Sequence, residues 1–211
     1  MLVEEVLSEV GQALDQVERE LREILIRETP HTREIALHLA ESGGKRVRPI
    51  MTLLAARVFT DDLQPAIPVA TAAEMIHMAT LVHDDVIDGA TIRRGRFTVN
   101  QRWGNPVSVL TGDILLAKAL VHLVDRAGAE IVKIMADMLY RMCEGEVAQN
   151  LTLHKLDQQE HDYFDRIEKK TALFFGACCR AGARISGAGE EESLALERFG
   201  RLLGMAFQII D

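Results

Sequence analysis

The sequence is poor in the residues and patterns that build β-sheets. Aromatic residues make up only 5% of its 211 residues, and strand signals are nearly absent along the chain. Hydrophobic residues make up 48%, most of them Leu, Ile, Val, Ala and Met, and this suits helices better than a β-sandwich. A chain of this length can bury one sizeable core. We therefore predict a single all-α domain over residues 1–211.

The chain also lacks a positive net charge and an even set of cysteines, and we expect no signal peptide. Its formal charge of −8 argues against nucleic acid as a partner, because binding the phosphate backbone needs a basic surface. Residues 1–20 have neither the basic nor the apolar region of a signal peptide. The cysteines have no metal-ligand spacing and indicate a reducing cytoplasm. They are Cys143, Cys178 and Cys179.

Apolar residues recur at helical spacing through most of the chain. The first stripe is formed by Leu7, Val10, Leu14, Val17, Leu21 and Ile24. The most apolar stretch, residues 66–82, is interrupted by Glu74 and His77 and is too short to span a bilayer comfortably, so we expect no integral membrane segment. Further helices are expected over residues 32–41, 47–59, 66–88, 106–126, 129–151, 158–185 and 190–211, with a basic loop over residues 91–96.

Three carboxylates, Asp84, Asp85 and Asp88, lie at the end of the helix expected over residues 66–88. Helical geometry puts Asp84 and Asp88 one turn apart, where like charges repel each other. Oxygen ligands in this arrangement suit Mg²⁺, whose remaining positions are filled by water and phosphate oxygens. The alternative is a solvated acidic helix face, which is the commoner origin of such a run when it stands alone.

Basic residues gather at three other points of the sequence. Residues 43–48, GGKRVR, combine two glycines with three cations at an expected helix start, where backbone N–H groups favour anions. Residues 93–94 are two arginines, and residues 169–171 are Lys-Lys-Thr within a helix. Taken singly, these could be a boundary turn, charge compensation and an exposed face, and His77 could be a satisfied core residue. Together with the aspartates they suit a diphosphate held beside a hydrocarbon.

Six segments carry a more specific likeness. They are GGKRVRP, EMIHMATLVHDDVIDGATIRRG, GDILLAKAL, EGEVAQN, KKTALF and GMAFQIID, in this order from residue 43 onward. In them the chain resembles the trans-isoprenyl diphosphate synthases (polyprenyl synthetases), and is most similar to their long-chain, menaquinone-associated heptaprenyl branch. The resemblance implies an isoprenoid-synthase bundle of long helices around a central cavity. It also implies a Mg²⁺-dependent 1′-4 condensation of isopentenyl diphosphate onto an allylic prenyl diphosphate.

The resemblance implies roles for individual residues. Asp84 and Asp88 would hold the Mg²⁺ with Asp85 supporting them, and Lys170 would act with them in catalysis. Asp211, the first residue of the family's second aspartate-rich motif, would be a further metal ligand. The residues implied to bind isopentenyl diphosphate are Lys45, Arg48, His77 and Arg94. Those implied to contact the allylic diphosphate are Arg93, Lys170, Thr171 and Gln208.

Product length is implied by the residues before the acidic cluster. Ala79 lies five residues before Asp84. In the family, the side chain at this position can close the end of the pocket that holds the growing chain. Neither Ala79 nor the following Thr80 is an aromatic plug, so the resemblance implies a long product near the hexaprenyl to heptaprenyl class. Ala79→Tyr should then shorten the product. A product of this kind, made for a quinone side chain, implies a cytoplasmic enzyme that works near a membrane surface.

The second aspartate-rich motif is barely begun at Asp211, where family members continue with further helices. We therefore expect a C-terminally incomplete domain that turns over slowly. The partner would be a second identical chain or a small regulatory subunit. Three other functions stay open: a class I terpene cyclase, a non-catalytic subunit of a heteromeric synthase, and a helical interaction protein that docks through the apolar stripe of its first helix.

Overall fold

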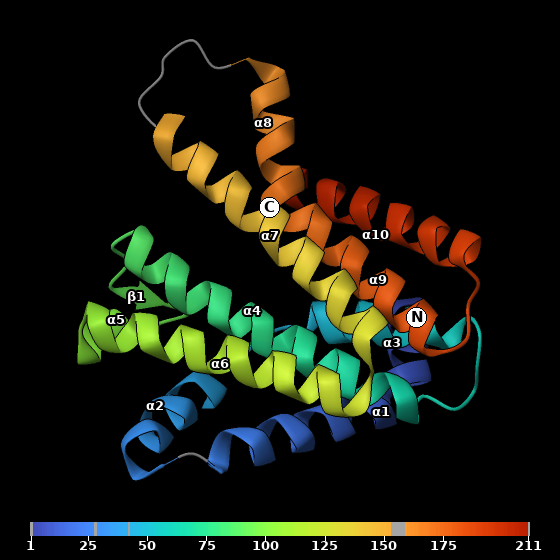
Figure 1. Cartoon of the computed structure of the whole chain (residues 1–211), viewed down its shortest axis with the longest axis horizontal. Coiled ribbons are helices and arrows are strands. Elements are labelled where there is room, and N and C mark those ends of the chain that lie inside the picture. The colour runs from blue at the N-terminus through green and yellow to red at the C-terminus, as the bar shows by residue number, and fades with distance from the viewer. Residues whose placement is uncertain (1, 28, 42, 153–158, 211) are drawn as a thin grey trace.

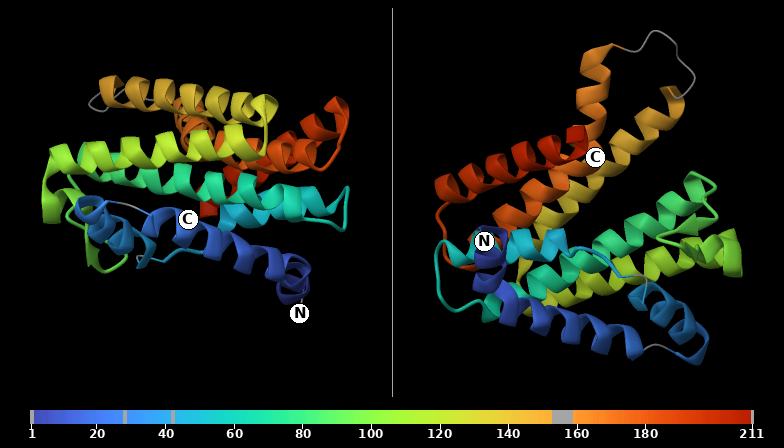
Figure 2. Two further views of the ribbon diagram at one scale, coloured as in Figure 1. Left: turned by 60° about the horizontal axis from the view of Figure 1, so that its bottom comes forward. Right: turned by 180° about the vertical axis from the view of Figure 1, so that it is seen from behind.

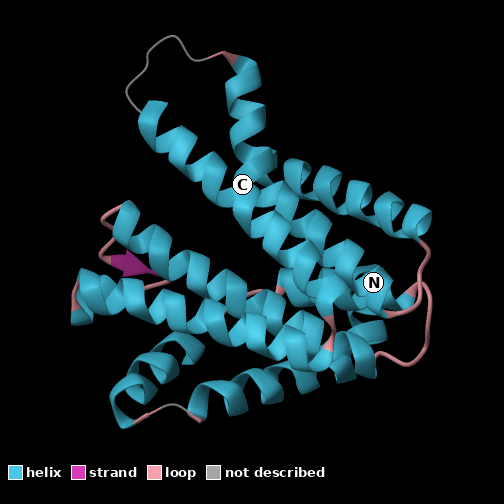
Figure 3. Cartoon of the chain, viewed as in Figure 1, coloured by secondary structure: helices cyan, strands magenta, loops and turns pink. Residues whose placement is uncertain are grey.

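The structure is a computed structural model that describes residues 2–27, 29–41, 43–152 and 159–210. Within these ranges it is an all-α bundle, as predicted, with one short hairpin (Figures 1 and 3). The first half of the chain forms α1 (Leu2–Ile26), α2 (Pro30–Glu41), α3 (Val47–Arg57), η1 (Gln64–Ala66), α4 (Ile67–Ile87), β1 (Ile92–Arg93) and β2 (Arg96–Phe97). The second half forms α5 (Val99–Trp103), α6 (Asn105–Arg126), α7 (Ala129–Thr152), α8 (Glu160–Ile167), η2 (Glu168–Ala172), α9 (Leu173–Ile185) and α10 (Glu190–Ile210).

Helix α4 lies at the centre of the bundle, packed against α1, α3 and α6 (Figures 1 and 2). Its residues 67–76 are buried without a break. Met75 and Ile76 are fully buried in the main core together with Leu123 of α6 and Phe174 of α9. Removing each such side chain from water contributes about 1.5–3 kcal/mol to folding. The acidic cluster therefore stands at the end of a helix that the core holds firmly.

Helix α1 buries its apolar stripe inside the molecule. Val10, Val17 and Leu21 are at most 1% exposed, and the helix packs on α3 and α4. Leu7, at the start of the stripe, is 40% exposed. The hypothesis of a protein that docks through the stripe of its first helix is therefore wrong, because the fold itself covers most of that stripe.

Three local features differ from the sequence prediction. The basic loop over residues 91–96 forms a two-stranded hairpin, whose tip residues Arg94 and Gly95 both have positive φ, 51° and 76°, as hairpin turns favour. A separate short helix, α5, precedes α6 and ends at Gly104, whose φ is 86°. The helix expected over residues 158–185 is interrupted by η2, a π-helical turn.

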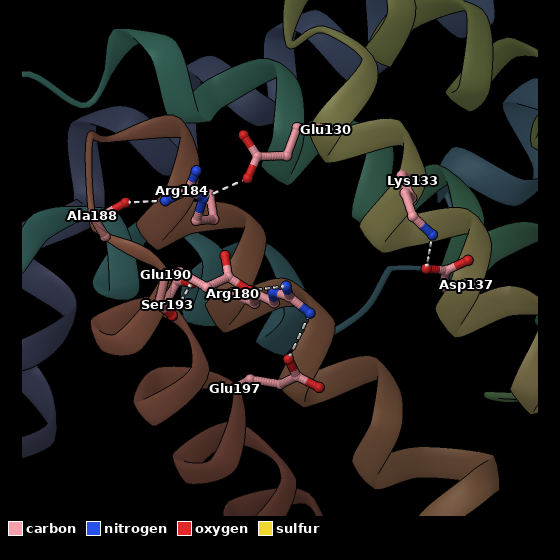
Figure 4. Close-up of polar contacts among 9 residues, drawn as sticks. All are labelled: Glu130, Lys133, Asp137, Arg180, Arg184, Ala188, Glu190, Ser193 and Glu197. Carbon is pink, nitrogen blue, oxygen red and sulfur yellow. Dashed lines mark hydrogen bonds and ion pairs between the residues drawn. The ribbon is translucent and has the colours of Figure 1, made fainter.

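Helices α9 and α10 pack closely, and salt bridges join them (Figure 4). Arg180 of α9 donates from Nη1 to Oε2 of Glu197 at 3.1 Å and from Nη2 to Oε1 of Glu190 at 2.7 Å. On its other side α9 approaches α3 so closely that a Cβ on Gly182 would lie 2.1 Å from the carbonyl oxygen of Thr52. This contact fixes α3, and with it the basic segment before α3, against α9.

Two helical stretches are long and apolar enough to cross a membrane by length and composition alone. They are residues 64–87 and residues 105–126. In the first stretch 78% of the apolar window is buried, as expected of a core helix. In the second, 33% is buried, and α6 exposes Leu110, Val121 and Val124.

Candidate functional site

A cavity of about 710 Å³ lies where the C-terminal end of α4 meets the segment before α3, the hairpin, η2 and the end of α10. It brings together residues that lie far apart in the sequence and that were predicted to form one site. The predicted site residues that line it are Lys45, Arg48, His77, Asp84, Asp88, Arg93, Arg94, Lys170, Thr171 and Gln208.

The acidic wall of this cavity is formed by Asp84 and Asp88, one helical turn apart. Burial, helped by nearby Glu146, raises the pKa of Asp84. Asp85 instead lines a smaller adjoining cavity, and its Oδ1 accepts a hydrogen bond from Nε of Arg93 at 2.7 Å. Asp85 thus holds Arg93 in place, while Asp84 and Asp88 face the main cavity.

The acidic wall offers hard oxygen ligands without forming a complete metal site. No three His, Cys, Asp or Glu side chains converge as a metal site within the part of the chain that the structure describes. Asp84 and Asp88 nevertheless fit a cation such as Mg²⁺, which needs only one or two carboxylates when phosphate oxygens and water supply the rest. Asp211, predicted as a further ligand, lies outside the described residues.

The same cavity is lined by Arg48 and His77, each with a buried nitrogen that finds no partner among the described residues: Nε of Arg48 and Nδ1 of His77. The guanidinium of Arg48 lies over the ring of Phe174, 4.7 Å from its centroid, and burial lowers its pKa. Burial, with the charge of Arg48 next, lowers the pKa of His77 to about 2, so the ring is neutral. Buried polar atoms without partners are rare, which makes these two side chains candidate ligand contacts.

The π-helical turn η2 supplies a further cation and a hydroxyl. Nζ of Lys170 lies 3.1 Å from Oε1 of Glu146 in α7, and Oγ1 of Thr171 donates to Oε1 of Gln208 in α10 at 2.8 Å. Burial acts against the charge of Lys170, but Glu146 and Asp84 outweigh it and raise its pKa. Lys170 is therefore a firmly charged cation beside the acidic wall.

A second cavity, of about 520 Å³, adjoins the first and continues between α4, α6 and α7. The two cavities share six lining residues: Arg48, His77, Leu81, Asp84, Lys170 and Thr171. Thr80 lines the second cavity, but Ala79 does not: it is 1% exposed and packs in the main core. The apolar lining residues include Leu81, Val86, Ile87, Val109, Met142, Val147 and Phe174. This cavity can hold a hydrocarbon next to the polar one.

Sequence reasoning missed the carboxylates that surround the basic residues. Glu146 was not singled out, although it lies in the EGEVAQN segment. Glu74 was noted only as an interruption of an apolar stretch, and its burial at 3% exposure in α4 is the signal that it has a specific partner. That partner is Arg46, which also contacts Glu18 of α1.

The fold and the two cavities define a class of protein: an all-α bundle with a polar cavity suited to a diphosphate and an adjoining cavity suited to an apolar chain. The comparisons give the family. The chain matches the polyprenyl synthetase family over residues 29–211 and belongs to it.

Named relatives are similar over most of this chain. It is 41% identical to heptaprenyl diphosphate synthase component 2 of Geobacillus stearothermophilus, over 100% of this chain and 66% of that protein. It is 44% identical to nonaprenyl diphosphate synthase of Mycobacterium tuberculosis, over 83% of this chain and 52% of that protein. A polyprenyl synthase from Caulobacter crescentus CB15, crystallised with calcium and isoprenyl diphosphate, matches with a TM-score of 0.93 at 36% identity, over 98% of this chain and 63% of that one. The chain thus spans between half and two-thirds of the length of these relatives.

Proposed function

We propose that this chain carries the substrate-binding core of a trans-polyprenyl diphosphate synthase, which condenses isopentenyl diphosphate with an allylic prenyl diphosphate. One observation carries the proposal: Asp84 and Asp88 line one cavity together with basic residues from three other segments, and this cavity adjoins a largely apolar one. The family match and the relatives named as prenyl diphosphate synthases support it. A terpene cyclase would need no basic segment over residues 43–48 to hold a second diphosphate.

Each set of lining residues has a part in the proposed reaction. Mg²⁺ held by Asp84 and Asp88 would draw off the negative charge of the departing allylic diphosphate. Arg93, Lys170, Thr171 and Gln208 would bind that diphosphate. Lys45, Arg48, His77 and Arg94 would bind isopentenyl diphosphate, whose double bond attacks the allylic carbon before a proton is lost. The apolar walls of the adjoining cavity would exclude water from the cationic centre.

The product is proposed to be long, near the hexaprenyl to heptaprenyl class, and to serve a menaquinone side chain. The support is the set of apolar residues in the lining of the second cavity and the heptaprenyl and nonaprenyl names of relatives. We further propose a partner chain, either an identical copy or a small regulatory subunit. The name "component 2" of the Geobacillus relative supports a two-part assembly. The proposed location is the cytoplasm, near a membrane surface where the product leaves.

An assay of purified protein with farnesyl and isopentenyl diphosphates tests the proposal. We expect elongated prenyl diphosphates in MgCl₂ and none in EDTA. Asp84→Asn should lower kcat by about 10²- to 10³-fold, because charge on the leaving diphosphate loses its stabilisation. Asp137→Asn, which removes an exposed carboxylate paired with Lys133 (Figure 4), should leave kcat unchanged.

Two outcomes would contradict the proposal. A cyclised hydrocarbon formed from the allylic substrate alone would identify a cyclase instead. Equal kcat values for the wild-type chain and Asp84→Asn would show that the carboxylate of Asp84 takes no part in the reaction.

A further inference from the structure

The basic segment before α3 contains a residue with an unfavourable backbone. Arg46 directly precedes α3 and has φ 51° and ψ 32°, in the left-handed region. That conformation costs a residue other than glycine about 1–2 kcal/mol. Arg46 lies between Lys45 and Arg48, two of the cations that line the diphosphate cavity. Contacts from elsewhere in the molecule must hold this turn.

Those contacts come from two other helices. Nη1 of Arg46 donates to Oε1 of Glu74 in α4 at 2.8 Å. Its Nε and Nη2 donate to the two carboxylate oxygens of Glu18 in α1, the latter at 3.3 Å. The side chains are largely buried, at 13% exposure for Arg46 and 4% for Glu74. Two-point pairing between an arginine and a carboxylate fixes orientation as well as distance.

The same contacts give Arg46 a different role from its basic neighbours, Lys45 and Arg48. All three of its guanidinium nitrogens donate to carboxylates, so its charge is already matched. Nε of Arg48, by contrast, is buried and has no partner among the described residues, and Lys45 is exposed at the cavity. The binding capacity of the segment therefore rests with Lys45 and Arg48, on either side of a residue that is held fast.

We propose that Arg46 is a positioning residue, held by Glu18 and Glu74 so that the turn over residues 44–48 directs Lys45 and Arg48 into the diphosphate cavity. This inference rests on the proposed function and deepens it, because it assigns to α1 and the buried end of α4 a part in binding isopentenyl diphosphate. Neither Glu18 nor Glu74 needs to touch the substrate for this role.

A positioning role of Glu18 and Glu74 and a purely electrostatic one predict opposite changes in diphosphate affinity when a carboxylate is removed. Glu18 and Glu74 are anions close to a site for an anion. Removing either charge would by Coulomb's law alone strengthen the binding of a diphosphate. If the carboxylates hold Arg46 in its turn, removing one frees the turn, and binding weakens. The sign of the change therefore decides between the two.

Isothermal titration calorimetry with inorganic diphosphate measures this sign. EDTA is added so that no metal bridges the ligand to Asp84 and Asp88, and the ionic strength is held constant. Glu18→Ala should raise the Kd by about tenfold, a loss of about 1.4 kcal/mol. The matched control is Glu9→Ala, because Glu9, like Glu18, is an α1 carboxylate paired with an arginine, in this case Arg57 of α3, at 3.2 Å. The Arg57 pair lies at the far end of α3 from the turn, so the Kd of the control should match the wild type.

Kinetics and a second variant complete the test. In Glu18→Ala the KM for isopentenyl diphosphate should rise by about tenfold while the KM for the allylic substrate and kcat stay within about twofold. General damage to the fold would not produce that split, and circular dichroism checks that the variant is folded. Arg46→Gly, which adopts positive φ without strain, should also bind diphosphate more weakly.

The outcomes separate this inference from the function on which it rests. Unchanged or tighter diphosphate binding by Glu18→Ala, or wild-type binding by Arg46→Gly, would overturn the positioning role and leave the proposed function standing. A wild-type chain that binds no diphosphate at millimolar concentration would overturn both.

Discussion

His77 shows how the fold sets the chemistry of a single residue. It lines both large cavities and the smaller one beside Asp85, and its ring is surrounded by arginines. Burial first, then the charges of Arg48, Arg94 and Arg93, keep it from taking a proton. The family resemblance implied that His77 is a site residue. Its neutrality depends on burial and on arginines from two separate segments, residues 46–48 and 93–94, which the resemblance could not reveal.

The low pKa of His77 makes stability depend on pH. Unfolded histidine takes up a proton below pH 6.5, whereas folded His77 does so only at about pH 2. Between these values the unfolded state binds more protons, so the free energy of unfolding falls as the pH falls. At pH 5 the loss relative to pH 7 should be on the order of 2 kcal/mol from this residue.

Urea unfolding between pH 4.5 and 7 measures this dependence. His77→Gln should flatten the fall in the free energy of unfolding, because glutamine does not titrate. The exposed His161 is the control, and His161→Gln should keep the wild-type slope. A slope that His77→Gln leaves as steep as in the wild type would contradict the neutral, buried state of His77.

At the scale of elements, hydrophobic periodicity predicted the long helices to within a few residues of their observed ends. It predicted α4 over residues 66–88, where the structure has Ile67–Ile87. It missed the π-helical turn η2, because the contacts around that turn are tertiary: Glu168 pairs with Arg201 of α10, and Lys169 lies against Gly145 of α7. No local pattern encodes such contacts.

The close approach of α3 and α9 predicts that one methyl group added at Gly182 lowers the stability of the fold. Gly182→Ala would place a Cβ 2.1 Å from the carbonyl oxygen of Thr52, and backbone cannot move aside cheaply. The free energy of unfolding should fall by about 1–3 kcal/mol, as in other overpacked contacts. Denaturant unfolding monitored by circular dichroism measures it.

Gly11 provides the matched comparison for this prediction. It is also helical, but a Cβ there meets nothing within 4 Å. Gly11→Ala should therefore stabilise the protein by up to about 1 kcal/mol through helix propensity. If Gly182→Ala were as stable as the wild type, the close α3–α9 contact would not exist in solution.

At the scale of the whole molecule, the site consists of two adjoining cavities rather than one. The sequence predicted which residues would meet in the polar cavity, and ten of them do. It could not distinguish Ala79 from Thr80, because adjacent helical residues point about 100° apart and only packing shows which one faces the apolar cavity. The structure places Thr80 there and Ala79 in the core.

This placement predicts different outcomes for two aromatic substitutions. Thr80→Tyr should fill the apolar cavity and shorten the product in the assay with farnesyl and isopentenyl diphosphates, read by mass spectrometry. Ala79→Tyr should instead lower the melting temperature, because overpacking a core costs about 1–3 kcal/mol or more. A shortened product from a fully stable Ala79→Tyr, with no change from Thr80→Tyr, would reverse the assignment.

The π-helical turn η2 constrains how the sequence can evolve. A π-turn contains one residue more than the α-helical turn it replaces. Deleting one residue from 168–172 would leave a regular α-helical turn between α8 and α9 and keep both helices in place, but residues within the turn would shift by one position, about 100° around the helix axis. Lys170 and Thr171 would then turn away from Asp84 and Gln208. The extra residue is thus an insertion that a lineage can lose only by losing the site with it.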